Sequence, residues 1–310
     1  MRGGNRFFSR GIVNHVYQRP LNWEVIFYDT FDLLVFFTVF CSVATRYQVR
    51  VFKLCQMPDH LHGSIAATHK TELSAFVRDY SAIFVREHNK TCHRSGPFFH
   101  SPFGSAPKYG DKMARTNFIY VDNNPVERRL SEQAEQYRWN YLAYAQSDHP
   151  FSEPYRKSEA SAKMQQAVSI VKSRHATGQY LPYALLRTLY KKLSKRECDQ
   201  LTDIIISTYN VIDYPASIQF FDTFDKMLTA IHSTTGSEHD LNEVFTGKDD
   251  RWYARFSELI QKEFRPKNIH DILAFPTEKR KDLFLFLSRQ TMAPAEQIAK
   301  YLRIDPPKRI

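Results

Sequence analysis

Two histidines lie one residue apart in the sequence Met-Pro-Asp-His-Leu-His-Gly, residues 57–63. They follow an apolar run and a Pro-Asp turn, so we expect a strand over 60–67. Residues two apart on a strand point to the same side of a sheet, so His60 and His62 can present two imidazoles to one metal ion. Imidazole suits several divalent metals, and an added oxygen ligand extends the choice to magnesium or manganese. One His-x-His triplet among 12 histidines also arises by chance, but a buried polar pair needs partners.

A tyrosine and an asparagine one helical turn apart form the second chemical feature. Tyr120 and Asn124 lie in Tyr-Val-Asp-Asn-Asn-Pro, at the end of a helix expected over 112–124 that Pro125 interrupts. A phenol with a pKa near ~10 is a poor nucleophile, and a nearby cation favours the phenolate and polarises a phosphate oxygen. Metal and tyrosine together indicate cleavage and rejoining of a phosphodiester strand, with the Asn124 side-chain oxygen as a third ligand. Most of the 17 tyrosines must nevertheless be packing or surface residues, and residues 122–124 also fit an ordinary helix end.

The elements that must position these residues mix strands and helices. We expect strands at 15–18, 25–28 and 48–57, and we expect 48–57 to be central because both of its faces are apolar. Asp29 or Thr30 caps a helix that runs to about Ala44, and a further helix begins near Thr71. Residues 96–111 read as a loop, and residues 126–144 read as another helix.

The second half of the chain is predicted to be almost wholly helical. A polar, proline-containing stretch at 146–154 marks a boundary, which divides the chain into domains 1–148 and 149–310. Ser194 to Glu197 forms a capping box, and apolar stripes follow at 218–231 and 252–260. Residues 283–302 resemble the first two helices of a helix-turn-helix, whose recognition helix would start near Asp305. The pattern is either a vestigial motif or ordinary helix packing, and packing is the favoured interpretation. The helical domain is therefore a possible DNA-binding domain.

Composition limits the class of protein. The chain has 310 residues, 43% of them hydrophobic, and a net charge of +10, which attracts polyanions, foremost nucleic acid. No run approaches the roughly 18 apolar residues of a membrane span, and the amino terminus lacks the apolar core of a secretory signal. The four cysteines have no CxxC spacing, which favours buried thiols in a reducing cytoplasm over disulfides or a zinc knuckle.

These residues together resemble a known family. His60-Leu61-His62 resembles the HUH motif of single-tyrosine transposases, and residues 120–125 resemble the tyrosine helix of the REP-associated tyrosine transposase branch. The runs at 15–19 and 57–60, the pair Phe103-Gly104 and the aromatic run 139–141 also match, so the resemblance covers about residues 1–145. It implies an α+β fold, with a ferredoxin-like antiparallel sheet that carries His60 and His62 on its central strand and Tyr120 on an adjacent helix.

The resemblance also implies a reaction and its partners. Tyr120 attacks the phosphorus of single-stranded DNA, often next to a hairpin, and holds the 5′ end as a phosphotyrosine. A divalent metal, Mg²⁺ or Mn²⁺, at His60, His62 and Asn124 orients the phosphate. We expect a cytoplasmic, nucleoid-associated DNA transposase with no membrane contact, for which a homodimer is an open option. The alternatives are an inactive or domesticated hairpin-binding protein and a metal-dependent RNA-processing enzyme or phosphodiesterase.

Basic and aromatic residues around the expected site offer DNA contacts. The basic residues available to phosphates are Arg19, Lys108, Lys112 and Arg115. Aromatic rings stack on unpaired bases for roughly 1–3 kcal/mol each, and the nearby rings are Phe98, Phe99, Phe103 and Tyr109. These loop aromatics also fit packing beneath the domain, which is the favoured interpretation.

Overall fold

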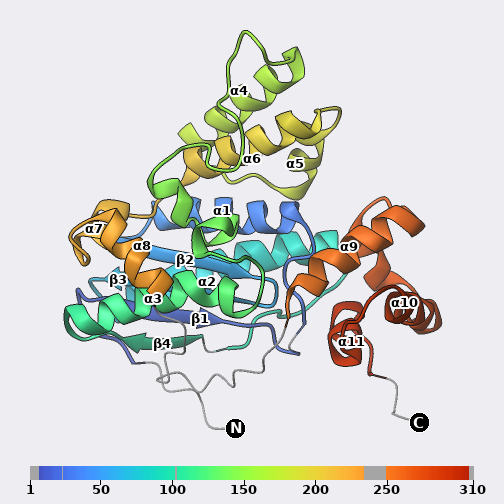
Figure 1. Ribbon diagram of the computed structural model, residues 1–310, viewed down its shortest axis with the longest axis horizontal. Coiled ribbons are helices and arrows are strands. Elements are labelled where there is room, and N and C mark those ends of the chain that lie inside the picture. The colour runs from blue at the N-terminus through green and yellow to red at the C-terminus, as the bar shows by residue number, and fades with distance from the viewer. Residues whose placement is uncertain (1–6, 23, 102, 234–248, 307–310) are drawn as a thin grey trace.

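The computed structural model describes residues 7–22, 24–101, 103–233 and 249–306 (Figure 1). Its first half contains four strands, β1 (Asn14–Gln18), β2 (Val49–Met57), β3 (His60–Ala67) and β4 (Gly104–Pro107). Three helices accompany them, α1 (Thr30–Ala44), α2 (Lys70–Thr91) and α3 (Gly110–Glu127).

The sheet has the ferredoxin-like connectivity. The chain runs β1-α1-β2-β3-α2-β4, and the antiparallel strands lie in the order β2-β3-β1-β4, which is the β-α-β-β-α-β arrangement. The prediction of an α+β fold with an antiparallel ferredoxin-like sheet is confirmed, and β3 is a central strand.

The two faces of β3 have different surroundings. Leu61 and Ile65 belong to the apolar core that α1 and α2 build on one face. The alternate positions His60, His62 and Ser64 are also buried, but they lie on the face that α3 covers. The period of two along the strand therefore separates an apolar core from a polar site.

Strand β2 is at an edge of the sheet, so the prediction of a central position is wrong. Its two faces are apolar because both are covered. Leu54 joins the core beneath α1 and α2, and Phe52 stacks on Phe118 of α3 with ring centroids 5.6 Å apart. A parallel bridge from Val51 to Ile212 covers part of the open edge. Two apolar faces therefore indicate that both faces of a strand are packed, and they do not indicate that the strand is central in its sheet.

The strand predicted at 25–28 is also wrong. These residues are buried in an irregular segment, and their backbone N–H groups donate outside any sheet. Ile26 N–H donates to the Pro58 carbonyl over 2.7 Å, and Tyr28 N–H donates to the Asp32 carboxylate over 2.6 Å. The β-type residues of this segment are buried without forming a strand, because acceptors outside any sheet satisfy the backbone N–H groups of Ile26 and Tyr28.

The segment between α2 and α3 holds one strand that the sequence pattern missed. Strand β4 pairs with β1 at the sheet edge within the predicted loop 96–111. It reads Gly-Ser-Ala-Pro, and glycine and proline are both depleted in strands.

Helix α3 continues past Pro125 to Glu127, so the predicted interruption is wrong. The helix predicted over 126–144 is replaced by three short 3-10 turns, η1 (Ala134–Gln136), η2 (Arg138–Asn140) and η3 (Leu142–Ala145). Arg129 and Tyr141 have positive φ values of 58° and 62°, and such left-handed residues break a right-handed helix. The aromatic side chains of this segment are buried or half-buried although the segment forms no regular helix.

The second half is helical as predicted. Its helices are α4 (Ala162–Ala176), α5 (Tyr183–Tyr190), α6 (Lys195–Tyr209), α7 (Tyr214–Gln219), α8 (Phe224–Ser233), α9 (Arg251–Phe264), α10 (Thr277–Gln290) and α11 (Ala295–Leu302), with a 3-10 turn η4 (Ile269–Ala274). Ser194 forms the expected capping box with Glu197. The stripe at 218–231 is divided between α7 and α8.

The helical half packs on the sheet domain at three places, one of which is formed by α7 and α8 against β2 and α3. Helices α4, α5 and α6 share one apolar core with α1, and α9 to α11 form another core that includes Val25 and Tyr28. Figure 1 shows these groups above the sheet and beside it. The division at residue 148 remains a prediction. Helices α10 and α11 exist as expected, but residues 303–306 are not helical, and residues 307–310 lie outside the described part of the chain.

No helix among the described residues is long and apolar enough to cross a membrane.

A buried ion pair joins β2 to α3 and gives the first prediction. Lys53 Nζ lies 2.6 Å from the Asp122 carboxylate, with both side chains almost fully buried. Lys53→Met leaves that carboxylate buried and unpaired, so we expect a loss of about 3–5 kcal/mol in the free energy of unfolding by urea. Arg50→Met is the matched control on the same strand. Its partner Asp213 is partly exposed, so we expect a loss below about 1 kcal/mol. Equal losses in the two variants would contradict the assignment.

Candidate active site

The three predicted metal ligands converge. His60 and His62 project from β3, and Asn124 reaches them from α3. The Asn124 side chain lies 3.2 Å from His60 Nε2 through Oδ1 and 3.3 Å from His62 Nε2 through Nδ2. All three are buried. Residues that are sixty positions apart in the chain therefore face one small space with their polar atoms.

Two residues that sequence reasoning did not assign hold His62 from behind. His15 Nε2 lies 2.9 Å from His62 Nδ1, and the Asn117 side chain lies 2.8 Å from His15 Nδ1. Ser64 Oγ donates to Asn117 Oδ1 over 2.7 Å. The sequence contained a signal for Asn117, because the spacing of Asn117, Tyr120 and Asn124 puts them on one face of a helix. His15 lies on the neighbouring strand β1, opposite Ser64 of β3.

His60 has its own supporting residues. Its Nδ1 lies 2.6 Å from Asp59 Oδ1, and the other Asp59 oxygen pairs with Lys300 of α11. Burial alone would raise the pKa of Asp59, but the charges of His60, Lys300 and Arg128 outweigh it and hold this pKa well below its usual value. The carboxylate therefore orients His60 so that Nε2 faces Asn124. No local sequence pattern points to Lys300.

Tyr120 packs against this histidine cluster. Its ring centroid lies 5.3 Å from that of His62 and 5.6 Å from that of His15, and the side chain is 8% exposed. Helix α3 packs on β2 and β3 of its own chain. The tyrosine and the histidines thus meet within one chain.

Two of the buried histidines of this site, His15 and His62, are neutral. Burial, with a smaller contribution from the Lys108 charge, lowers the pKa of His15 to about 3. Burial, together with His60 and His15, holds the pKa of His62 well below its ordinary value. A neutral imidazole keeps a lone pair for a metal. Two imidazoles and an amide oxygen supply nitrogen and oxygen donors, so these residues fit a divalent cation such as Mg²⁺ or Mn²⁺.

The predicted DNA contacts occupy different positions. Lys112 and Arg115 are exposed near the start of α3, and Arg115 also donates to the Phe220 carbonyl over 3.3 Å. Arg19 is half-buried just after β1. Lys108 is 2% exposed and lies near enough to His15 to affect its pKa. Only Lys112 and Arg115 among the four therefore lie on an open surface.

The loop aromatics are mostly packing residues. Phe98, Phe99 and Phe103 are buried in the core beneath the sheet, as favoured from the sequence. Tyr109, at the start of α3, is 61% exposed, which leaves it as the aromatic ring of this set that a base could reach.

The fold and the site define a class: an α+β domain whose central strand presents two histidines to an asparagine and a tyrosine of one neighbouring helix. Residues 14–124 match the protein-family model described as "Transposase IS200 like". Over these residues the chain is similar to IS200-like transposases.

Among solved structures, the chain is similar to one described as "Structure of the REP associates tyrosine transposase bound to a REP hairpin". The two share 14% sequence identity with a TM-score of 0.41, over 47% of this chain and 85% of that chain. No curated protein matches the chain.

The support of His62 by His15 gives a second prediction. His15→Ala removes the hydrogen bond to His62 Nδ1, and such supporting residues contribute about 10–100-fold to metal affinity. We expect the Mn²⁺ concentration for half-maximal strand cleavage to rise by that factor, as measured by titration. His100→Ala, an exposed histidine, should leave the midpoint unchanged. An unchanged midpoint in His15→Ala would show that His62 needs no such support.

Proposed function

We propose that this protein cleaves and rejoins single-stranded DNA through Tyr120. The observation that carries the proposal is the meeting of Tyr120 with His60, His62 and Asn124 inside one chain, within a domain of a transposase family. The contact of the Tyr120 ring with His62 supports this proposal, because strand transfer needs a nucleophile and a metal at the same phosphate.

The reaction is balanced without any external energy source. The Tyr120 oxygen bonds to the scissile phosphorus and its proton is lost, while the bond from phosphorus to the 3′ oxygen breaks and that oxygen takes up a proton. The DNA 5′ end is then held as a phosphotyrosine. Attack by a 3′-hydroxyl of the same or another strand reverses these changes and releases the tyrosine.

The other site residues have supporting roles. His60, His62 and Asn124 would hold the divalent metal, which when bound polarises a phosphate oxygen. Asp59 and His15 orient the two imidazoles. Because α3 packs on its own sheet, we propose that Tyr120 acts within its own subunit, even if the protein forms a homodimer.

The partner that we propose is single-stranded or hairpin DNA. The net charge of +10 attracts phosphates, and Lys112, Arg115 and Tyr109 are exposed on the helix that carries Tyr120. Charged and stacking side chains on one element are typical of sequence-tolerant single-strand binding.

Covalent capture tests the proposal. A pool of labelled single-stranded oligonucleotides, with and without hairpins, is incubated with the protein and Mg²⁺ or Mn²⁺ and separated on a denaturing gel. We expect a protein–DNA adduct that carries the 5′ end of the cut, together with a product ending in a free 3′-hydroxyl. Hydrolysis without an adduct would indicate a phosphodiesterase. Hairpin binding without cleavage at any metal concentration would indicate an inactive, domesticated DNA-binding protein.

A further inference from the structure

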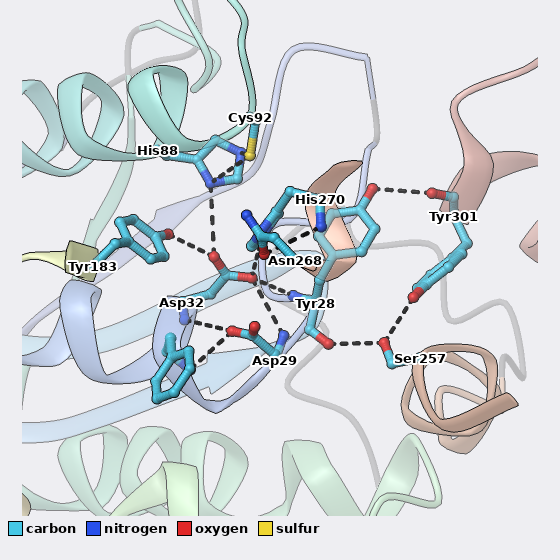
Figure 2. A network of polar contacts seen from close by, with 11 residues as sticks. Tyr28, Asp29, Asp32, His88, Cys92, Tyr183, Ser257, Asn268, His270 and Tyr301 are labelled. Atoms are coloured by element: carbon cyan, nitrogen blue, oxygen red, sulfur yellow. Dashed lines mark hydrogen bonds and ion pairs between the residues drawn. The ribbon is translucent and has the colours of Figure 1, made fainter. Parts of the chain in front are cut away.

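A second group of potential metal ligands lies away from the candidate active site. His88 and Cys92 lie one turn apart near the end of α2, and His270 lies in η4 of the carboxy-terminal region. Figure 2 shows His88 and His270 beside the carboxylate of Asp32, which belongs to the first turn of α1, and Cys92 next to His88. Segments that are distant in sequence thus bring three potential ligands together, with a carboxylate beside the two imidazoles.

The group is compact and shielded from solvent. One ligand atom from each of His88, Cys92 and His270 lies within 4.8 Å of the others. Cys92 Sγ is 3.5 Å from His88 Nε2, and Asp32 Oδ2 is 2.9 Å from His270 Nε2. The exposed fractions of the three are 0%, 4% and 1%. Two ligands bound to one ion by bonds of about 2.0–2.3 Å lie less than ~4.6 Å apart, and the 3.5 Å and 2.9 Å spacings meet this condition.

A buried ion pair accounts for only half of the group. His270 faces the Asp32 carboxylate with Nε2 and the Asn268 oxygen with Nδ1 over 2.9 Å, so without a metal it is a cation that donates from both nitrogens. That pair needs neither His88 nor Cys92. A metal ion at this position would explain why a thiol and a second imidazole are buried beside the pair.

We propose that His88, Cys92 and His270 bind a structural Zn²⁺, and that the Asp32 carboxylate, 2.9 Å from His270 Nε2 and 3.9 Å from His88 Nδ1, completes the ligand set. Sulfur, nitrogen and oxygen are all ligands that zinc takes in four-coordinate sites. Binding releases the Cys92 thiol proton and the His270 Nε2 proton to solvent. The Asn268 oxygen accepts from His270 Nδ1 and so orients this imidazole toward the proposed ion.

Further donors hold the Asp32 carboxylate in position. The Tyr183 hydroxyl donates to Asp32 Oδ1 over 2.5 Å, and Tyr28 N–H donates to Oδ2 over 2.6 Å. Bonds from such neighbours orient a ligating carboxylate. The ion would link η4 to helices α1 and α2 of the sheet domain. It would thereby also link the core formed by α9 to α11 to these helices.

Metal content tests the proposal independently of DNA cleavage. The full chain carrying His60→Ala and His62→Ala, which removes the candidate active site as a source of signal, is dialysed against metal-free buffer and its zinc is measured by mass spectrometry. We expect about one zinc ion per chain. Cys92→Ala in this background should lower the content by roughly tenfold or more, whereas Cys198→Ala, a partly buried cysteine on α6, should leave it unchanged.

Cobalt provides a readout that is specific for sulfur. Replacement of zinc by Co²⁺ should give a near-ultraviolet thiolate-to-cobalt band in the parent that is absent from Cys92→Ala, and the candidate active site has no sulfur ligand to produce it. A zinc-free parent, a cobalt complex without this band, or a band that survives Cys92→Ala would overturn the proposal. If circular dichroism shows that Cys92→Ala does not fold, the zinc content and cobalt spectrum of the parent decide alone.

Discussion

Tyr120→Phe is expected to abolish the covalent protein–DNA adduct while binding of the same oligonucleotide persists. The substitution removes a single oxygen, and the ring that packs against His62 and His15 is retained. Without that oxygen no phosphotyrosine forms, so the rate of strand cleavage should fall by a factor on the order of 10⁴ or more. The adduct is measured on a denaturing gel and binding by fluorescence anisotropy.

Tyr137→Phe is the matched control. Tyr137 is a neighbouring tyrosine that packs against the same small cluster as Tyr120, and its hydroxyl donates to the Gln56 carbonyl over 2.8 Å. Loss of this hydrogen bond should cost only about 1 kcal/mol of stability and leave the adduct intact. An adduct that survives Tyr120→Phe would assign the nucleophile to another residue.

His60→Ala is expected to have the second-largest effect. The substitution removes one of the two imidazoles that face Asn124. Metal assistance to phosphoryl chemistry is worth several kcal/mol, so cleavage should slow by about 10³-fold at a fixed Mg²⁺ or Mn²⁺ concentration. The rate is measured as single-turnover cleavage across a metal titration, and excess Mn²⁺ should restore part of it.

His69→Ala controls for the loss of a histidine near the same strand. His69 is exposed and its side chain makes no cap hydrogen bond to α2, so its removal should not alter cleavage or its metal dependence. Circular dichroism of the His60 variant separates lost chemistry from lost folding. Equal, metal-independent cleavage in both variants would exclude His60 as a ligand.

Local patterns predicted the parts of the molecule that local forces determine. The alternation of His60, Leu61 and His62 predicted which side chains share a face, because a strand has a period of two. The caps at Asp29 and Ser194 were predicted because each side chain bonds within its own turn. The spacing of Tyr120 and Asn124 predicted one helix face for the same reason.

Contacts between distant segments were beyond such patterns. The pairing of Lys300 with Asp59 and the meeting of His270 with Cys92 depend on how the carboxy-terminal helices dock. The irregular backbone at 25–28 is another case, because its hydrogen bonds depend on Pro58 and Asp32. Pro125 shows the reverse: its local signal to end a helix was overridden in a helix that packs on β2 and is covered by α8.

The ion pair between Lys300 and Asp59 links the carboxy-terminal helices to the candidate active site, so shortening the protein would affect that site. A chain cut back to its first 148 residues would keep His60, His62, Asn124 and Tyr120, yet it would lose the lysine that pairs with the carboxylate beside His60. It would also uncover the side chains of Val25 and Tyr28. We therefore expect a shortened chain to hold His60 in place less firmly unless it retains Lys300 or carries another positive charge at that position.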